Sequence, residues 1–125
     1  MKFAISAPVR ITWQADYNDT GDLVCVVAED VTLAQYGLPG QIILSGFRSD
    51  GMSIPRFFWR WLSPKVEGHT ISPGIVHDWL YTVKTLTRAG ADEWLRQALI
   101  ANGMKWHKAA AVWLAVRLFG RSHWN

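Results

Sequence analysis

The hydrophobic pattern of this chain changes period near residue 55, and this change constrains the fold more than any other feature of the sequence. Before it, short runs rich in β-branched residues alternate with turn-forming residues, as is typical of antiparallel strands. After it, apolar residues recur at spacings of three and four, the period of an amphipathic helix. We therefore expect an α+β fold, in which a small N-terminal antiparallel β-sheet packs against a C-terminal bundle of about three helices.

Short apolar runs and the polar segments between them define the expected strands and turns. The predicted strands are VRITW at 9–13, LVCVVAE at 23–29 and QIILSGF at 41–47, and the predicted turns are DYNDTGD at 16–22 and GLPG at 37–40. Cys25 is the only cysteine of the sequence, so no internal disulfide can form. Its apolar neighbours predict a small buried hydrophobe.

Capping residues and periodicity predict the helices. Ser72 and Pro73 are the expected N-cap and first-turn proline of a helix of about ten residues. Thr87 is the expected N-cap of a second helix, which Gly103 ends, and a third should cover residues 105–119. The short connection between the first two helices predicts an antiparallel hairpin.

Length and aromatic content predict one domain with an aromatic-rich core. The 125 residues suffice for a single core, so we expect one domain over 1–125, mainly β and loop over 1–55 and mainly α over 56–125. Eight tryptophans should contribute strongly to burial. Trp94 and Trp113 fall on the apolar stripes of their helices, so both are expected to be largely buried.

The charge is mildly basic and unevenly distributed. The net charge of +3 permits an anionic partner, and no carboxylate residue follows Glu93. The basic residues and histidines noted after that point are Lys105, His107, Lys108, Arg117, Arg121 and His123. They predict either a surface facing phosphate groups or a solvated helix face. The apolar runs are too short for a signal peptide or a membrane-spanning helix, so we expect the chain to be made in the cytoplasm.

A polar cluster is expected where the first two helices meet. On a helix, His77, Asp78 and Tyr81 are close neighbours, and Asp92 lies at the margin of the next helix. A carboxylate bound to one imidazole nitrogen would leave the other nitrogen able to take a proton from water. Asp78 would remain available for a hard cation, with Asp50 in the loop 49–51 as a source of further oxygen ligands.

Other interpretations of these residues stay open. A His-Asp pair at a helix edge also caps, forms a salt bridge or satisfies a buried neighbour. Ser53 with His77 and Asp92 would form a nucleophilic triad, although no Gly-x-Ser-x-Gly turn precedes it. His69 with His77 and Asp78 would bind zinc, but the eight-residue separation of the two histidines is not the i, i+4 spacing of a helical zinc motif and neither supports nor excludes such a site. The aromatic cluster at 57–61 either packs in the core or inserts into a membrane interface.

Four motifs in order resemble a phage and prophage family known as domain of unknown function 1353. These motifs are GFRSDGMSIP at 46–55, HDWLY at 77–81, ADEWLRQAL at 91–99 and WLAVRLFG at 113–120. The chain has Ser49 where the family usually has threonine, and Met52 where alanine is usual. The resemblance implies a phage-type origin and supplies no activity.

HDWLY followed by an Ala-Asp helix is also similar to the His-Asp-x-x-Tyr helix of phospholipase A2. That resemblance implies that His77 is the general base, Asp78 a calcium ligand, Asp92 the carboxylate orienting His77, and Tyr81 its support. The usual glycine-rich calcium loop and the disulfides of those enzymes are absent from this sequence.

Together these resemblances imply a phage-derived hydrolase with bound Ca²⁺, which acts on an ester in lipid or another cell-envelope component. The expected partner is then a lipid or envelope surface, and no nucleic acid is expected. The alternative is a non-enzymatic phage structural or assembly protein, for example in the tail, that binds other phage proteins. Either one would be made in the bacterial host cytoplasm, and a virion-associated location would follow assembly.

Overall fold

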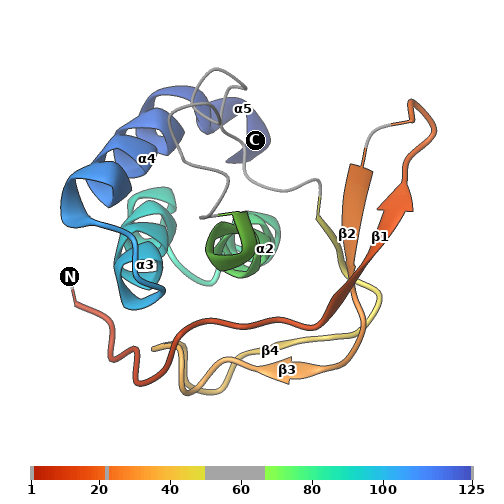
Figure 1. The fold of residues 1–125 in the computed structure, drawn as a ribbon, viewed down its shortest axis with the longest axis horizontal. Coiled ribbons are helices and arrows are strands. Elements are labelled where there is room, and N and C mark those ends of the chain that lie inside the picture. The colour runs from red at the N-terminus through yellow and green to blue at the C-terminus, as the bar shows by residue number, and fades with distance from the viewer. Residues whose placement is uncertain (1, 22, 50–66, 125) are drawn as a thin grey trace.

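The computed structural model describes residues 2–21, 23–49 and 67–124. Five strands come first: β1 (Trp13–Tyr17), β2 (Leu23–Val27), β3 (Val31–Thr32), β4 (Ile42–Ile43) and β5 (Arg48–Ser49). Among the described residues the helices that follow are α2 (Glu67–Val83), α3 (Arg88–Ala101), α4 (Trp106–Phe119) and the short α5 (Arg121–Trp124). In Figure 1, the helices pack together and the β1-β2 hairpin extends to one side of them. The expected α+β arrangement is confirmed.

The strands form two small antiparallel sheets. One has the order β1-β2-β5, with Trp13 opposite Val27 and Tyr17 opposite Leu23, and the other pairs β3 with β4. The predicted turn at 16–22 is too long, because β1 continues through Tyr17. The turn itself is stabilised by Asn18, whose side-chain oxygen accepts a hydrogen bond from the Thr20 N–H at 3.1 Å.

The predicted first strand at 9–13 is wrong except for Trp13, because the helices bind this part of the backbone. The Val9 N–H donates to Asn102 Oδ1 at 2.7 Å, and Asn102 Nδ2 donates back to the Val9 carbonyl at 2.9 Å. The Ile11 N–H donates to Ser72 Oγ at 2.9 Å. These side chains satisfy backbone groups that a neighbouring strand would otherwise have satisfied.

The predicted start of the first helix is also wrong. Helix α2 is already formed at Glu67, so Pro73 lies inside it and Ser72 is not its N-cap. The buried Ser72 hydroxyl instead accepts the hydrogen bond from Ile11. A serine before a proline is the usual signal for a helix start, but here the serine holds a distant segment of the chain.

The other two long helices begin and end as expected. The Thr87 hydroxyl accepts a hydrogen bond from the Gly90 N–H at 3.0 Å, which caps α3, and Gly103 has a φ of 98° just after this helix. Helix α4 ends at Phe119, with Gly120 in the C-cap position. None of the helices within the described residues is long and apolar enough to span a bilayer.

The core lies where the three long helices meet the strands and the N-terminal segment. Trp94 is fully buried, as predicted, and its Nε1–H donates to the Tyr36 carbonyl at 2.7 Å. Cys25 is buried, also as predicted. Trp113 is less buried than Trp94, because its side chain is only partly covered. Its ring lines a hollow of about 300 Å³ on the surface between α3 and α4.

Candidate functional site

The helix hairpin brings His77 of α2 to Asp92 of α3. His77 Nε2 lies 2.8 Å from Asp92 Oδ1, and both side chains are buried. This confirms the predicted contact across the hairpin. Because Asp92 is held in its ionised form, we assign the proton of the shared hydrogen bond to Nε2, which leaves Nδ1 as the basic nitrogen.

Tyr81 binds the same carboxylate oxygen from one turn further along α2. Its hydroxyl donates to Asp92 Oδ1 at 2.5 Å, and its ring lies 4.4 Å from the His77 ring, centroid to centroid. Burial and the Asp92 carboxylate raise the pKa of Tyr81 well above its ordinary range, so the hydroxyl stays protonated as a donor.

Two small features hold Tyr81 in place. Trp124 of α5 packs edge-on against it, with the ring centroids 5.1 Å apart. A Cβ atom at Gly120 would lie 2.7 Å from the Tyr81 hydroxyl oxygen, so only glycine fits there without displacement. Gly120 therefore ends α4 and also leaves room for the tyrosine.

Arg117 of α4 binds the second oxygen of Asp92. Its Nη1 donates to Asp92 Oδ2 at 2.9 Å, while about a third of the arginine side chain remains exposed. Burial alone would raise the pKa of Asp92, but hydrogen bonds from His77, Tyr81 and Arg117 hold it below its ordinary range. The buried carboxylate thus joins α2, α3 and α4.

No local pattern in the sequence indicates that Arg117 binds Asp92. Arg117 was grouped with the other basic residues after Glu93, as a surface charge. Asp92 was expected only at the margin of its helix, but it is fully buried, and a buried carboxylate requires a compensating cation. Arg88 also bridges to α4, donating to the carbonyls of Val116 and Arg117 at 2.9 and 2.7 Å.

The residues expected to bind metal are not brought together in the described part of the chain. Asp78 is half-buried on α2, and its carbonyl accepts a hydrogen bond from the Thr82 hydroxyl at 3.0 Å. Within residues 2–21, 23–49 and 67–124, no three His, Cys, Asp or Glu side chains group closely enough to hold an ion. Asp50 and Ser53 lie outside the described residues, as do the aromatic residues at 57–61.

The surface hollow lies beside this cluster. Its lining includes Arg117, Trp113 and Glu93, together with Thr87, Ala89 and Gly90 from the start of α3. Arg117 connects the two features, because it lines the hollow and also binds Asp92.

Comparison with known proteins places the chain in a family. Residues 27–116 match the model of the family described as "Protein of unknown function (DUF1353)", so the chain belongs to this family. The chain is also similar to "Uncharacterized protein y4jT" of Sinorhizobium fredii (strain NBRC 101917 / NGR234), with 32% identity over 76 residues. The match covers 61% of this chain but only 23% of that protein. No solved structure matches the chain.

Proposed function

We propose that this protein is a phage-derived hydrolase that cleaves an ester bond in lipid or another envelope component, with His77 as the general base. One observation carries the proposal: Asp92 Oδ1 lies 2.8 Å from His77 Nε2 and also accepts the Tyr81 hydroxyl. An orienting carboxylate on one imidazole nitrogen is the arrangement that prepares the other nitrogen to accept a proton.

The reaction follows from this orientation. His77 Nδ1 takes a proton from a water molecule, whose oxygen attacks the ester carbonyl carbon to give a tetrahedral intermediate. The intermediate collapses, and the proton held at Nδ1 passes to the departing alkoxide, which leaves as an alcohol. Asp92 stabilises the imidazolium formed between these steps. Ester and water are thus converted to acid and alcohol, with His77 regenerated.

The resemblance to phospholipase A2 adds calcium, with Asp78 and Asp50 as ligands. The described residues do not by themselves make up such a site, because Asp78 is not joined there by two further ligand side chains. The reaction above therefore uses only side chains of the described residues, and calcium binding is a separate property of Asp78 and Asp50.

A second candidate is a non-enzymatic phage structural or assembly protein. It is favoured by the burial of the cluster, since His77 is 1% exposed and Asp92 is fully buried. In this account the hydrogen bonds to Asp92 only hold three helices together. A water-excluded polar network of this kind can serve packing alone.

The substitution His77→Gln separates the two candidates. A glutamine side-chain N–H can replace the Nε2–H donor to Asp92, but it offers no basic nitrogen. We expect hydrolysis of a water-soluble ester such as p-nitrophenyl butyrate to fall at least about a hundredfold. The melting temperature should change little.

The matched control is His107→Gln, which makes the same change at an exposed histidine. It should hydrolyse the ester at the parental rate. If the folded parent hydrolyses no faster than the His77→Gln variant, with both short-chain and lipid esters, the hydrolase proposal is overturned.

A further inference from the structure

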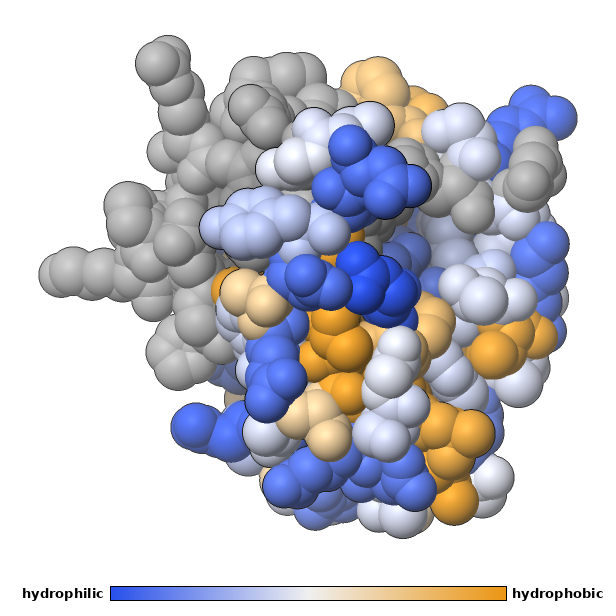
Figure 2. Space-filling view, turned by 90° about the vertical axis from the view of Figure 1, so that its right-hand side faces the viewer, coloured by the Kyte–Doolittle hydropathy of each residue, from blue (hydrophilic) through white to orange (hydrophobic). Residues whose placement is uncertain are grey.

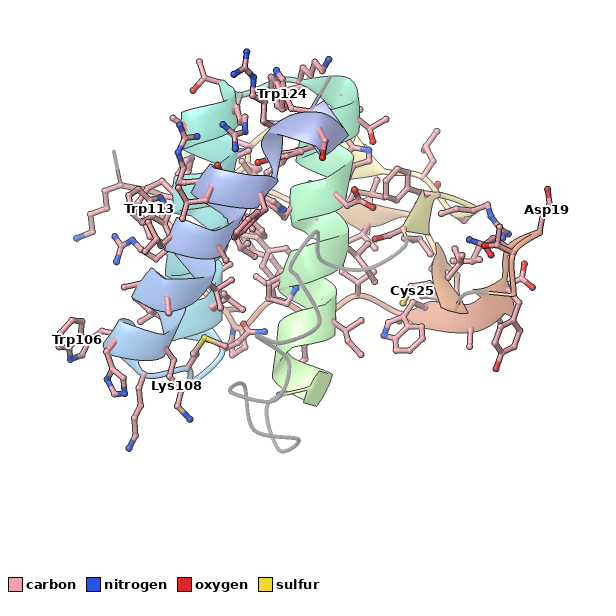
Figure 3. The ribbon with its side chains drawn as sticks, turned by 90° about the horizontal axis from the view of Figure 1, so that it is seen from above. Asp19, Cys25, Trp106, Lys108, Trp113 and Trp124 are labelled. Atoms are coloured by element: carbon pink, nitrogen blue, oxygen red, sulfur yellow. The ribbon has the colours of Figure 1, made fainter. Side chains whose placement is uncertain are left out.

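Helix α4 exposes a row of apolar side chains on the face that points away from the core. Trp106 is 73% exposed, Leu114 is 51% exposed and Leu118 is 64% exposed. Residues four apart share a helix face, so these three form one stripe with Ala110 between them. The buried side of α4 is formed by other residues, namely Ala109, Val112, Ala115 and Val116. In Figure 3, Trp106 projects away from the neighbouring helices.

The ends of this stripe carry positive charge. Lys105 and Arg121 are exposed at the two ends of α4, and Lys108 is half-exposed near its start. No aspartate or glutamate follows Glu93 in the sequence, so no acidic side chain of that segment offsets these charges. Exposed aromatic and aliphatic side chains with basic residues beside them are what a protein uses at an anionic lipid interface.

The opposite side of the molecule differs from this face. Figure 2 shows the side that carries the strands, where hydrophilic and hydrophobic residues are intermixed. Leu44 is as exposed as Leu118, at 64%, but it belongs to the β4-β5 connection and not to a helical stripe. Ile42, two positions earlier, is also exposed, but two such residues make a small patch, whereas a longer helical row of exposed apolar residues marks an interaction surface.

We propose that the outward face of α4, from Lys105 to Arg121, docks on an anionic membrane surface. Trp106, Leu114 and Leu118 would enter the interface between headgroups and acyl chains, and the basic residues would bind lipid phosphates. A second copy of the chain fits this face poorly, because a two-fold contact would bring like charges together. A nucleic acid would match the charge but would leave the apolar stripe without a role.

The inference deepens the proposed function, since it names an anionic lipid bilayer as the surface on which the ester substrate is found. It does not require hydrolysis, because docking is a property of α4 alone. Vesicle binding can therefore be measured with the His77→Gln variant, so that failure of docking and failure of catalysis are distinguished.

The experiment is co-sedimentation of the chain with vesicles of phosphatidylcholine, with or without roughly 30 mol% phosphatidylglycerol. We expect binding to the anionic vesicles only, weakened as salt rises from about 0.05 to about 0.5 M. Leu118→Gln should lower the membrane partition coefficient at least about tenfold, because burying one leucine side chain in an apolar environment favours binding by at least that factor. Leu44→Gln is the matched control, with equal initial exposure, and should bind as the parent does.

Charge is tested in the same assay. Lys105→Glu with Arg121→Glu should abolish binding, whereas Arg10→Glu, at an exposed position outside α4, should retain most of it. The proposal is overturned if the chain binds neutral vesicles as strongly as anionic ones, or binds neither. It fails too if Leu118→Gln and Leu44→Gln weaken binding to anionic vesicles equally. It is also overturned by a dimer that Leu118→Gln dissociates, or by DNA binding that Leu118→Gln leaves unchanged.

Discussion

Arg117 and Asp92 form a 2.9 Å ion pair that joins the exposed surface of the protein to its buried polar cluster. The arginine comes from α4, the helix with the exposed apolar stripe, and the carboxylate also binds His77 and Tyr81. One buried charge therefore positions the proposed base and holds the proposed docking helix. Changes at Asp92 should consequently affect both stability and activity.

Asp92→Asn should lower the free energy of unfolding by about 3 kcal/mol at neutral pH, because it removes the charge that compensates Arg117. The pKa of Asp92 is depressed in the folded state, so its contribution to stability is present above the unfolded pKa of about 4. It is lost as pH falls through the lower folded pKa. Urea unfolding between pH 2 and pH 6 measures this dependence.

Asp19→Asn is the control, since Asp19 is exposed in the β1-β2 turn. It should leave both the stability and its pH dependence nearly unchanged. An Asp92→Asn variant whose stability falls toward low pH as steeply as that of the parent would contradict the assignment of this contribution to Asp92.

Gly120→Ala should destabilise the protein by about 1–3 kcal/mol, as overpacking does elsewhere. The φ of Gly120 is −77°, so alanine fits the backbone and any cost comes from contact with Tyr81 and the Val116 carbonyl. In a Tyr81→Phe background part of that cost should disappear, because the hydroxyl is gone. Thermal unfolding of the parent, the two single variants and the double variant gives the coupling free energy between Gly120 and Tyr81. If Gly120→Ala lowers stability equally in the parent and in the Tyr81→Phe background, Gly120 does not act through the Tyr81 hydroxyl.

Trp94→Ala should cost about 3–5 kcal/mol, the usual range for a core aromatic. It removes a fully buried ring and leaves the Tyr36 carbonyl without its donor. Trp113→Ala should cost clearly less, because the Trp113 ring is partly exposed beside the hollow. Denaturant unfolding compares the two. If both alanine variants lose the same free energy of unfolding, Trp113 contributes as much to the core as Trp94 does.

Calcium at millimolar concentration should raise the melting temperature, if Asp78 and Asp50 bind it as the resemblance to phospholipase A2 implies. Asp78→Asn and Asp50→Asn should each abolish the increase, while Asp19→Asn should retain it. A melting curve indifferent to calcium, with both variants as stable as the parent, would remove calcium from the proposal and leave the His77–Asp92 contact untouched.

The parts of the fold that sequence analysis predicted depend on local signals. The Thr87 cap and the short connection before it set the helix hairpin, and the position of Asp92 on α3 then brings it to His77. The spacing of residues along two adjacent helices was enough to predict this contact. The same local reasoning located the end of α4 at Gly120.

The parts that it missed depend on contacts between residues far apart in the chain. Residues 9–12 have the composition of a strand, but Asn102 and Ser72 bind their backbone, and neither partner can be identified from local pattern. Because Ser72 binds the backbone of Ile11, it is not the N-cap that its position before Pro73 predicted. Arg117 was missed because the packing of α4 against α3, not its position in the sequence, brings it to Asp92.

We propose that His77, oriented by Asp92, hydrolyses an ester in an anionic lipid surface. The most direct measurement is the release of fatty acid and lysolipid from phosphatidylglycerol vesicles, followed by mass spectrometry, for the parent and for His77→Gln at a temperature where both are folded. We expect release by the parent and a rate at least about a hundredfold lower for the variant. Equal rates, or no release by a parent that is bound to the vesicles, would contradict it.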